Sequence, residues 1–262
     1  MSTDIRIDVY SHVATVTLSR PEVRNAFNDA VIARLSETFV QLGERADVRA
    51  IVLAAEGPAF CAGADLNWMR RMADYSREEN LQDAAQLAFM LRTLYECPKP
   101  TVARIQGDVY AGGMGLVAAC DMAVSVDTAH YCLSEVKLGL IPATISPYVI
   151  RAMGPRAAHR WFLTAERFGA AEALRMGFVH EVVPAEQLDD KVGELVRALT
   201  AASPGAVRSA KRLVQDVAGR DITRLLIDRT VEGIADIRAS DEGKEGVQSF
   251  LQKRKPAWLQ SS

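Results

Sequence analysis

Three short segments of the chain combine residues whose types and spacing suit ligand binding by backbone amides and the transfer of protons. The first, AFCAGADLNWM (59–69), places small residues and a helix-capping Asp65 directly after a predicted strand. In the second, QGDVYAGGMGLVAACD (106–121), Gly112 and Gly113 precede an apolar helical pattern. Small side chains leave backbone amides approachable, and the first amides of a helix are unpaired donors at the positive end of its dipole. The first segment therefore predicts either amides that a ligand can approach or an ordinary strand-to-helix turn, and the second predicts N–H groups placed for developing negative charge.

The third segment, HYCLSEVKLGLIPATISP (130–147), supplies one acid. Glu135 lies in apolar surroundings, where burial raises the pKa of a carboxyl and suits it to proton transfer near neutrality. A glutamate that only bonds to the backbone at a helix start is the simpler alternative. Acyl-enzyme chemistry is not expected, because there is no GxSxG elbow and Ser134 has no evident base. His130 is interpreted as a structural or surface residue.

The bulk composition excludes several other classes of protein. The 262 residues carry a formal net charge of −2 without a block of like charge, which argues against nucleic-acid binding. GGMG lacks the spacing of a dinucleotide-binding fingerprint. The start of the chain is polar, and no apolar run approaches the roughly 18–20 residues of a membrane helix, so we predict a cytoplasmic protein without a membrane partner. The four cysteines are widely spaced, so neither a metal site nor a disulfide framework is expected.

The elements that must position these segments follow an alternating pattern. Strands are predicted at 5–10, 13–18, 49–55, 101–105 and 122–126. Helices are predicted between them at 28–45, 78–95 and 112–120. Alternation through about residue 185 indicates an α/β fold with successive crossovers.

After about Glu186 the sequence shows only helical patterns. These lie near 186–201, 204–218, 221–238 and 241–252. The chain is therefore divided into a core (1–200) that carries the site and a helical region (201–262) that packs on the core or on another subunit. Phe250, Leu251, Trp258 and Leu259 are poor residues to leave in water, and a tail folded on its own core explains them as well as a subunit contact does.

Five motifs in order resemble one family over nearly the whole chain. They are SRPEVRNAFN, AFCAGADL, GGMGLVAACD, SEVKLGLIP and FLQKRKPAW. The chain resembles the enoyl-CoA hydratase/isomerase, or crotonase, superfamily. This resemblance implies a crotonase-like α/β spiral of ββα units, with a C-terminal helical region (201–262) that builds homotrimers, commonly stacked as homohexamers.

The resemblance also implies an acyl-CoA thioester substrate and assigns residues to it. The oxyanion hole maps to the amides of Ala64 and Gly112, each worth about 3 kcal/mol in stabilising an enolate, and Glu135 is the catalytic acid/base. Coenzyme A contacts map to Val23, Arg24, Ala62, Ala64, Asp65, Leu66, Asn67 and Gly112. Arg24 is suited to a phosphate, with Lys253 and Lys255 as weaker candidates. Coenzyme A is part of the substrate, so no separate cofactor and no metal is implied.

One position departs from the pattern of well-studied hydratases, which use two glutamates. The second is present as Glu135, but the first falls on Gly115, which cannot act as a base. By mechanism alone, a single shuttling carboxylate favours a 3,2-trans-enoyl-CoA isomerase. A non-catalytic acyl-CoA-binding protein is a third interpretation that the missing glutamate allows.

The sequences around the chemical segments favour a hydratase instead. The stretches around Gly112 and Glu135 resemble hydratases of branched, carboxylated substrates, the methylglutaconyl-CoA and carboxygeranoyl-CoA hydratases. Such a substrate needs a cation for its distal carboxylate, and three residues are available, with nothing to select among them: Arg104, Lys137 and Arg151. Tyr110 is expected either to line the acyl pocket or to pack in the core. The segment 142–145 (PATI) replaces a glycine-rich turn, which predicts a different pocket shape.

Overall fold

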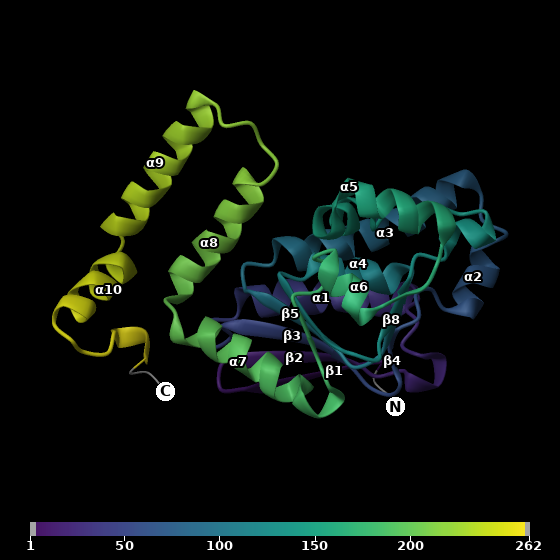
Figure 1. Ribbon diagram of the computed structural model, residues 1–262, viewed down its shortest axis with the longest axis horizontal. Helices are drawn as coiled ribbons and strands as arrows, with labels where there is room; N and C mark the ends of the chain where they lie inside the picture. Colours follow the sequence, from purple (N-terminus) through teal and green to yellow (C-terminus); the bar gives the residue numbers. More distant parts are fainter. Residues whose placement is uncertain (1–3, 260–262) are drawn as a thin grey trace.

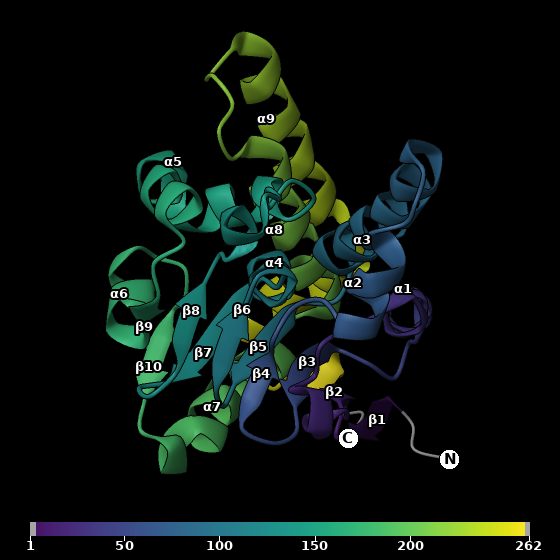
Figure 2. The ribbon, with the colours of Figure 1, turned by 90° about the vertical axis from the view of Figure 1, so that its right-hand side faces the viewer.

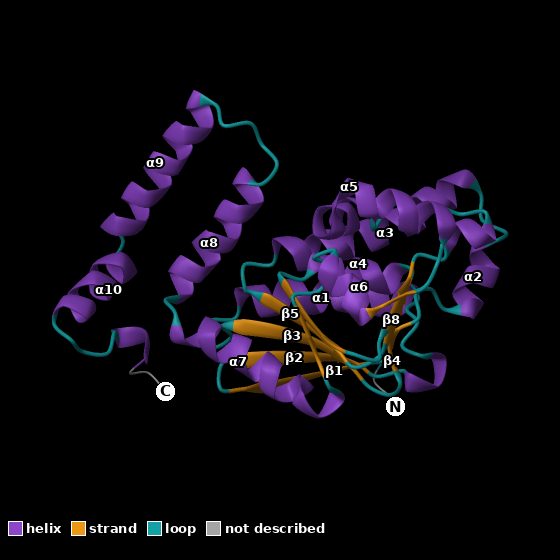
Figure 3. Ribbon diagram, viewed as in Figure 1, coloured by secondary structure: helices purple, strands orange, loops and turns teal. Residues whose placement is uncertain are grey.

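Two sheets form the centre of the computed structural model, which describes residues 4–259 (Figure 1, Figure 3). In the larger sheet, β1 (Ile5–Tyr10) pairs antiparallel with β2 (Val13–Leu18). Parallel strands then follow across the sheet in the order β3 (Ala50–Ala55), β5 (Thr101–Ile105), β7 (Met122–Val126) and β10 (Glu181–Val183). Strands β3 and β5 are apolar almost throughout because both faces of the sheet are covered.

The smaller sheet is built from short strands that continue the strands of the larger one. Its order is β4 (Ala59–Cys61), β6 (Asp108–Tyr110) and β8 (His130–Cys132), all parallel, with β9 (Phe168–Gly169) antiparallel at the edge. The pairs β3–β4, β5–β6 and β7–β8 each run from the larger sheet into the smaller one before a helix or helical turn follows. This repeated unit is the predicted ββα spiral.

Helices cover both sides of the strands. The core helices are α1 (Asp29–Glu44), α2 (Leu66–Met72), α3 (Arg77–Glu96), α4 (Gly112–Ala119), α5 (Ser146–Thr164), α6 (Ala170–Arg175) and α7 (Leu188–Ala201). Figure 2 shows α4 and α7 on opposite sides of the strands. Helix starts follow from local chemistry, because the Asn28 side chain accepts the Val31 amide and Ser76 with Glu79 forms a capping box.

The C-terminal helices α8 (Pro204–Val217), α9 (Arg224–Ala239) and α10 (Asp241–Leu251) extend away from the sheets, on the left of Figure 1. Helix α8 is tied to the core by an ion pair between Lys211 Nζ and Asp121 Oδ2, 2.8 Å apart, with the lysine side chain 8% exposed. One part of the tail folds back on its own chain, as one predicted alternative has it, and another part stays exposed, as a subunit contact would require. The Trp258 indole donates to the Ala201 carbonyl of its own chain, whereas Phe250 and Leu251 remain 81% and 73% exposed.

The elements predicted for the core and for the C-terminal helical region agree with the structure to within a few residues. Within residues 4–259, only helices follow β10. The prediction missed the strands of the smaller sheet, because two or three residues cannot show a period. It also missed α5, where Gly154 and Pro155 interrupt the helical pattern. Among residues 4–259, no helix combines the length and apolar character needed to span a bilayer.

Candidate active site

The three segments predicted to carry chemistry lie beside one another because they leave adjacent parallel strands. Ala64 comes three residues after β4 ends, Gly112 two residues after β6, and Glu135 three residues after β8. These strands pair in the order β4-β6-β8, so their carboxyl ends lie at one edge of the smaller sheet. Ligands of α/β proteins commonly bind at such an edge. The topology therefore brings the predicted oxyanion donors and the predicted acid to one place.

The amide of Ala64 is an unpaired donor. Phe27 forms an isolated parallel bridge with Ala64, in which the Phe27 amide donates to Gly63 O at 2.9 Å and the Asp65 amide donates to Phe27 O at 3.0 Å. In this pattern, the N–H of the central residue points away from its partner strand. No acceptor for the Ala64 amide occurs in the described part of the chain. The donor is thus available to a ligand.

The amide of Gly112 is the first of helix α4 and is available in the same way. The preceding residue, Ala111, donates to Cys132 O at 2.8 Å and has φ 47° and ψ −121°, a strained conformation for an L-residue. A Cβ added to Gly112 would lie 2.3 Å from Phe27 Cζ, so no larger residue fits without movement of the ring. Close packing and strain together fix the direction of this donor.

The two turns that carry the amides are in direct contact. A Cβ built on Gly63, whose φ is +90°, would lie 3.0 Å from Ala111 Cβ and 3.6 Å from the Gly112 nitrogen. Ala64 follows Gly63, so the two unpaired donors belong to neighbouring turns. The structure thus places the two predicted donors on adjacent turns, and their role around one carbonyl oxygen stays a prediction.

Glu135 opens the 3₁₀ turn η2 (Glu135–Leu138). Its backbone carbonyl accepts the Leu140 amide at 3.1 Å, which fixes the turn. Its Oε2 is buried, and no partner for that atom exists among residues 4–259. Burial raises the pKa of this carboxyl against the weaker opposing effect of its own amide. A half-buried acid with a free oxygen is suited to move a proton.

Ile145 fills the space beside Gly115. A Cβ added to Gly115 would lie 2.3 Å from Ile145 Cγ2, 2.9 Å from Ile145 Cβ and 3.4 Å from Leu91 Cδ2. Ile145 is 2% exposed and belongs to the PATI segment. The position therefore lacks a second carboxylate and also lacks room for one. The different pocket shape predicted from 142–145 stays a prediction.

The segments predicted to hold coenzyme A lie together. The Ala62 amide donates to Arg24 O at 3.0 Å, which joins the turn after η1 (Pro21–Val23) to the segment 62–67. Val23 and Arg24 are exposed. The prediction missed Asn25, which is 3% exposed. Its side-chain amide Nδ2 donates to Glu56 O and Ala59 O at 2.7 and 2.8 Å. Its only sequence signal is the tolerance of asparagine for a left-handed backbone.

The side chain of Asp65 is already engaged within the protein. It accepts the Asn67 amide at 2.8 Å at the start of α2, and Arg20 Nη2 lies 3.0 Å from its other oxygen. Burial opposes ionisation, but the Asn67 amide and the Arg20 guanidinium together hold the pKa of Asp65 below its usual range. Asp65 therefore fixes the segment, whereas Leu66, at 69% exposed, faces outward.

The predicted cations are not equivalent. Arg104 Nε lies 2.6 Å from Asp189 Oδ1 in a groove between the larger sheet and α7, away from Glu135. Arg151 lines a cavity of about 560 Å³ between α5 and α8 that does not include Glu135. Lys137 is exposed and lies two residues from Glu135. Lys253 and Lys255 follow α10, at the opposite end of the molecule from α2 (Figure 1), so they do not join this site within one chain.

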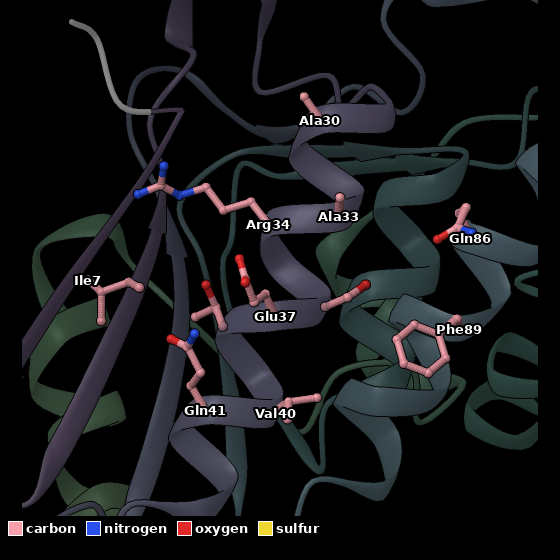
Figure 4. A pocket seen from close by; sticks show the side chains of 11 residues that line it. Ile7, Ala30, Ala33, Arg34, Glu37, Val40, Gln41, Gln86 and Phe89 are labelled. Atoms are coloured by element: carbon pink, nitrogen blue, oxygen red, sulfur yellow. The ribbon is translucent and has the colours of Figure 1, made fainter.

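A groove of about 1040 Å³ between β1, α1 and α3 is separate from these residues (Figure 4). Ile7, Arg34, Glu37 and Phe89 are among the side chains that line it. None of the predicted site residues belongs to its lining. The groove therefore does not bring the predicted site residues together.

Comparisons with known proteins agree with this architecture. The family model for enoyl-CoA hydratase/isomerase matches residues 8–261. A solved enoyl-CoA hydratase from Shewanella pealeana is 40% identical, with a TM-score of 0.95 over 98% of this chain and 96% of that one. One from Mycobacterium smegmatis is 35% identical, with a TM-score of 0.92 over 98% and 99%. The enoyl-CoA hydratase AKT6-1 of Alternaria alternata is 34% identical over 92% of this chain and 78% of its own.

The fold and the family match define the class of this protein. The chain belongs to the enoyl-CoA hydratase/isomerase family, has the crotonase fold and is an enzyme of that family.

Proposed function

We propose that this enzyme is an enoyl-CoA hydratase with one catalytic carboxylate. The Ala64 and Gly112 amides bind the thioester oxygen, and Glu135 transfers the protons. The observation that carries the proposal is the buried Oε2 of Glu135, which has no partner among residues 4–259, on the segment that leaves β8 next to the strands whose turns carry the two unpaired amides. The similar proteins named as hydratases support the choice of reaction.

The proposed mechanism needs only groups of this chain. The Glu135 carboxylate takes a proton from water as the water oxygen bonds to C3 of the 2-enoyl thioester. The electrons move onto the thioester oxygen, where the two amides stabilise the enolate, each by about 3 kcal/mol. Glu135 then gives a proton to C2, and the carboxylate is restored. Water has been added across the double bond, and no metal or redox cofactor takes part.

Ile145 beside Gly115 favours a second candidate, the 3,2-trans-enoyl-CoA isomerase. With no room for another acid, one carboxylate would remove a proton from C2 of a 3-enoyl thioester and return it at C4. The test offers crotonyl-CoA, 3-methylglutaconyl-CoA and 3-hexenoyl-CoA in oxygen-18-labelled water. A labelled 3-hydroxyacyl product supports the hydratase. Conversion of the 3-enoyl substrate without label supports the isomerase, and tight binding without turnover of any substrate supports a binding protein.

For a branched, carboxylated substrate such as 3-methylglutaconyl-CoA, we propose Lys137 as the cation for the distal carboxylate. Of the three predicted cations, it alone adjoins Glu135 along the chain. An exposed ion pair contributes about 0.5–1 kcal/mol. Lys137→Gln should therefore lower kcat/KM about two- to fivefold for 3-methylglutaconyl-CoA and leave crotonyl-CoA unaffected. Equal effects on both substrates would contradict this role.

We further propose that the chain assembles as a homotrimer or homohexamer through α8–α10. These helices expose a large apolar surface that includes Val214 (66%), Leu225 (64%) and Phe250 (81%). A neighbouring copy would also be the source of Lys253 and Lys255 near coenzyme A. Sedimentation equilibrium should give three or six chains, whereas a monomer at micromolar concentration would contradict the assembly.

A further inference from the structure

A polar network crosses the open face of the smaller sheet next to the oxyanion turn. It consists of Asp108, Tyr110, His130 and Arg167, which we call the Asp108 network. In β6 and β8, Val109 and Tyr131 point inward and are 0% exposed, so their neighbours Asp108, Tyr110 and His130 point to the opposite face. None of these four residues has a part in the mechanism above.

The Asp108 carboxylate is the centre of the network. It accepts the Tyr110 hydroxyl at 2.7 Å and the His130 amide at 2.9 Å. Arg167 Nη2 lies 3.4 Å from the same carboxylate, and its guanidinium lies over the Tyr110 ring, 5.4 Å from the centroid. The network therefore joins β6, β8 and the residue that precedes β9. Burial, followed by the Asp108 acceptor, raises the pKa of Tyr110 to about 12, so its hydroxyl remains a donor at neutral pH.

The network is continuous with the strained turn. Tyr110 is followed by Ala111, with its φ of 47° and ψ of −121°, and then by the Gly112 donor. A Cβ built on Gly63 would lie 3.2 Å from Tyr110 O, so the neighbouring turn that carries Ala64 rests on the same backbone. Strain of this kind persists only where surrounding contacts hold it, because a relaxed turn would be lower in energy.

We propose that Tyr110 and Arg167 are positioning residues, which clamp β6 through Asp108 and so hold Ala111 in the conformation that aims the Gly112 amide at the thioester oxygen. This inference rests on the proposed oxyanion role of Gly112. Tyr110 touches no reacting atom and acts through the backbone. Small displacements of a catalytic group are costly, since about 1 Å of misplacement can reduce a rate 100-fold.

A purely structural role would lower the melting temperature when the network is lost, but the exposure of the network argues against a large effect. His130 and Arg167 have side chains 51% and 56% exposed, and exposed ion pairs contribute little to stability. Loss of the network should therefore leave the melting temperature nearly unchanged. A positioning role instead lowers kcat and leaves KM almost the same, because the donor acts mainly on the charge that develops in the transition state.

The variants Tyr110→Phe and Arg167→Met test this inference, with Arg175→Gln as the matched control. Tyr110→Phe removes only the hydroxyl, and Arg175 forms a similarly exposed pair with Glu172 on α6. We expect kcat to fall about 10-fold in both network variants, with KM within about twofold and no change in the control. The double variant should be little worse than either single variant, because the residues act together.

Acetoacetyl-CoA provides a readout that does not depend on turnover. Its enolate absorbs in the near ultraviolet, so the enolate fraction on the enzyme reports the strength of the two amide donors. The fraction should fall in Tyr110→Phe and Arg167→Met and stay at the wild-type level in Arg175→Gln. Unchanged kcat and enolate absorbance in the two variants would overturn the inference even if the wild type is an active hydratase. A wild type without turnover of any enoyl-CoA would instead overturn the proposed function, and the enolate signal would still decide the positioning role.

Discussion

The packing of Ile145 against Gly115 predicts the effect of adding a single methyl group. In Gly115→Ala, the new Cβ would approach Ile145 Cγ2 to 2.3 Å, more than 1 Å closer than the usual carbon contact of about 3.5–4.0 Å. Neither partner can move easily, because both are buried and Leu91 closes another side. Overpacking of this kind costs about 1–3 kcal/mol.

A matched control separates packing from helix propensity. Gly115 lies within α4, where alanine is favoured over glycine by about 1 kcal/mol, so the net destabilisation should be about 0–2 kcal/mol. Gly233 lies within α9 and has no atom within 4 Å of an added Cβ. Gly233→Ala should therefore gain about 0.5–1 kcal/mol from propensity alone. The difference between the two variants measures the overpacking.

The Ile145→Ala background completes a double-mutant cycle. It removes Cγ2 and leaves the contacts of 2.9 Å with Ile145 Cβ and 3.4 Å with Leu91 Cδ2, at a cost of about 2–5 kcal/mol for the cavity. In this background, Gly115→Ala should be less destabilising than in the wild type, a coupling of at least about 1 kcal/mol. Thermal unfolding followed by circular dichroism resolves this, at about 2–4 °C per kcal/mol. If Gly115→Ala melts as high as Gly233→Ala, Ile145 does not fill the space.

Three further predictions concern the site. The acid limb of the kcat/KM profile should have an apparent pKa above 4.5, because burial raises the pKa of Glu135. As pH rises from 4.5 through that pKa, the free energy of unfolding measured in urea should fall relative to that of Glu135→Gln. Matching curves of unfolding free energy against pH for the two proteins would contradict the shift. Gly112→Ala should lose about 100-fold in kcat, since its Cβ would lie 2.3 Å from Phe27 Cζ and displace the donor; unchanged steady-state kinetics would exclude that amide. Asp65→Ala should cost about 2 kcal/mol, since it removes a helix cap and the nearer of the two carboxylates that pair with Arg20, and an unchanged melting temperature would contradict this.

Much of the fold followed from the sequence because the long elements have clear periods. Five of the six strands of the larger sheet were predicted, from runs such as 49–55 and 101–105, whose apolar character reflects burial on both faces, whereas the three-residue strand β10 was missed. The strands of the smaller sheet were missed, although they place the three chemical segments at one edge. Their pairing depends on long-range contacts that no local pattern records.

The candidate site was predicted only at the level of residue types. Glycines before a helix pattern indicated Gly112, and an acid in apolar surroundings indicated Glu135. The strain at Ala111, the buried bonds of Asn25 and the contact between Ile145 and Gly115 arise when segments distant in sequence meet. Such features lie outside any sequence period.

The most direct test of the account is the activity of Glu135→Gln, with Glu172→Gln on α6 as the control. The amide keeps the size of the side chain but cannot take up a proton. With crotonyl-CoA and 3-methylglutaconyl-CoA, the account predicts that kcat falls by about 10²- to 10⁴-fold, while butyryl-CoA binds as in the wild type. The control should keep full activity. A folded Glu135→Gln enzyme that hydrates either substrate at the wild-type rate would contradict the central role of this carboxylate.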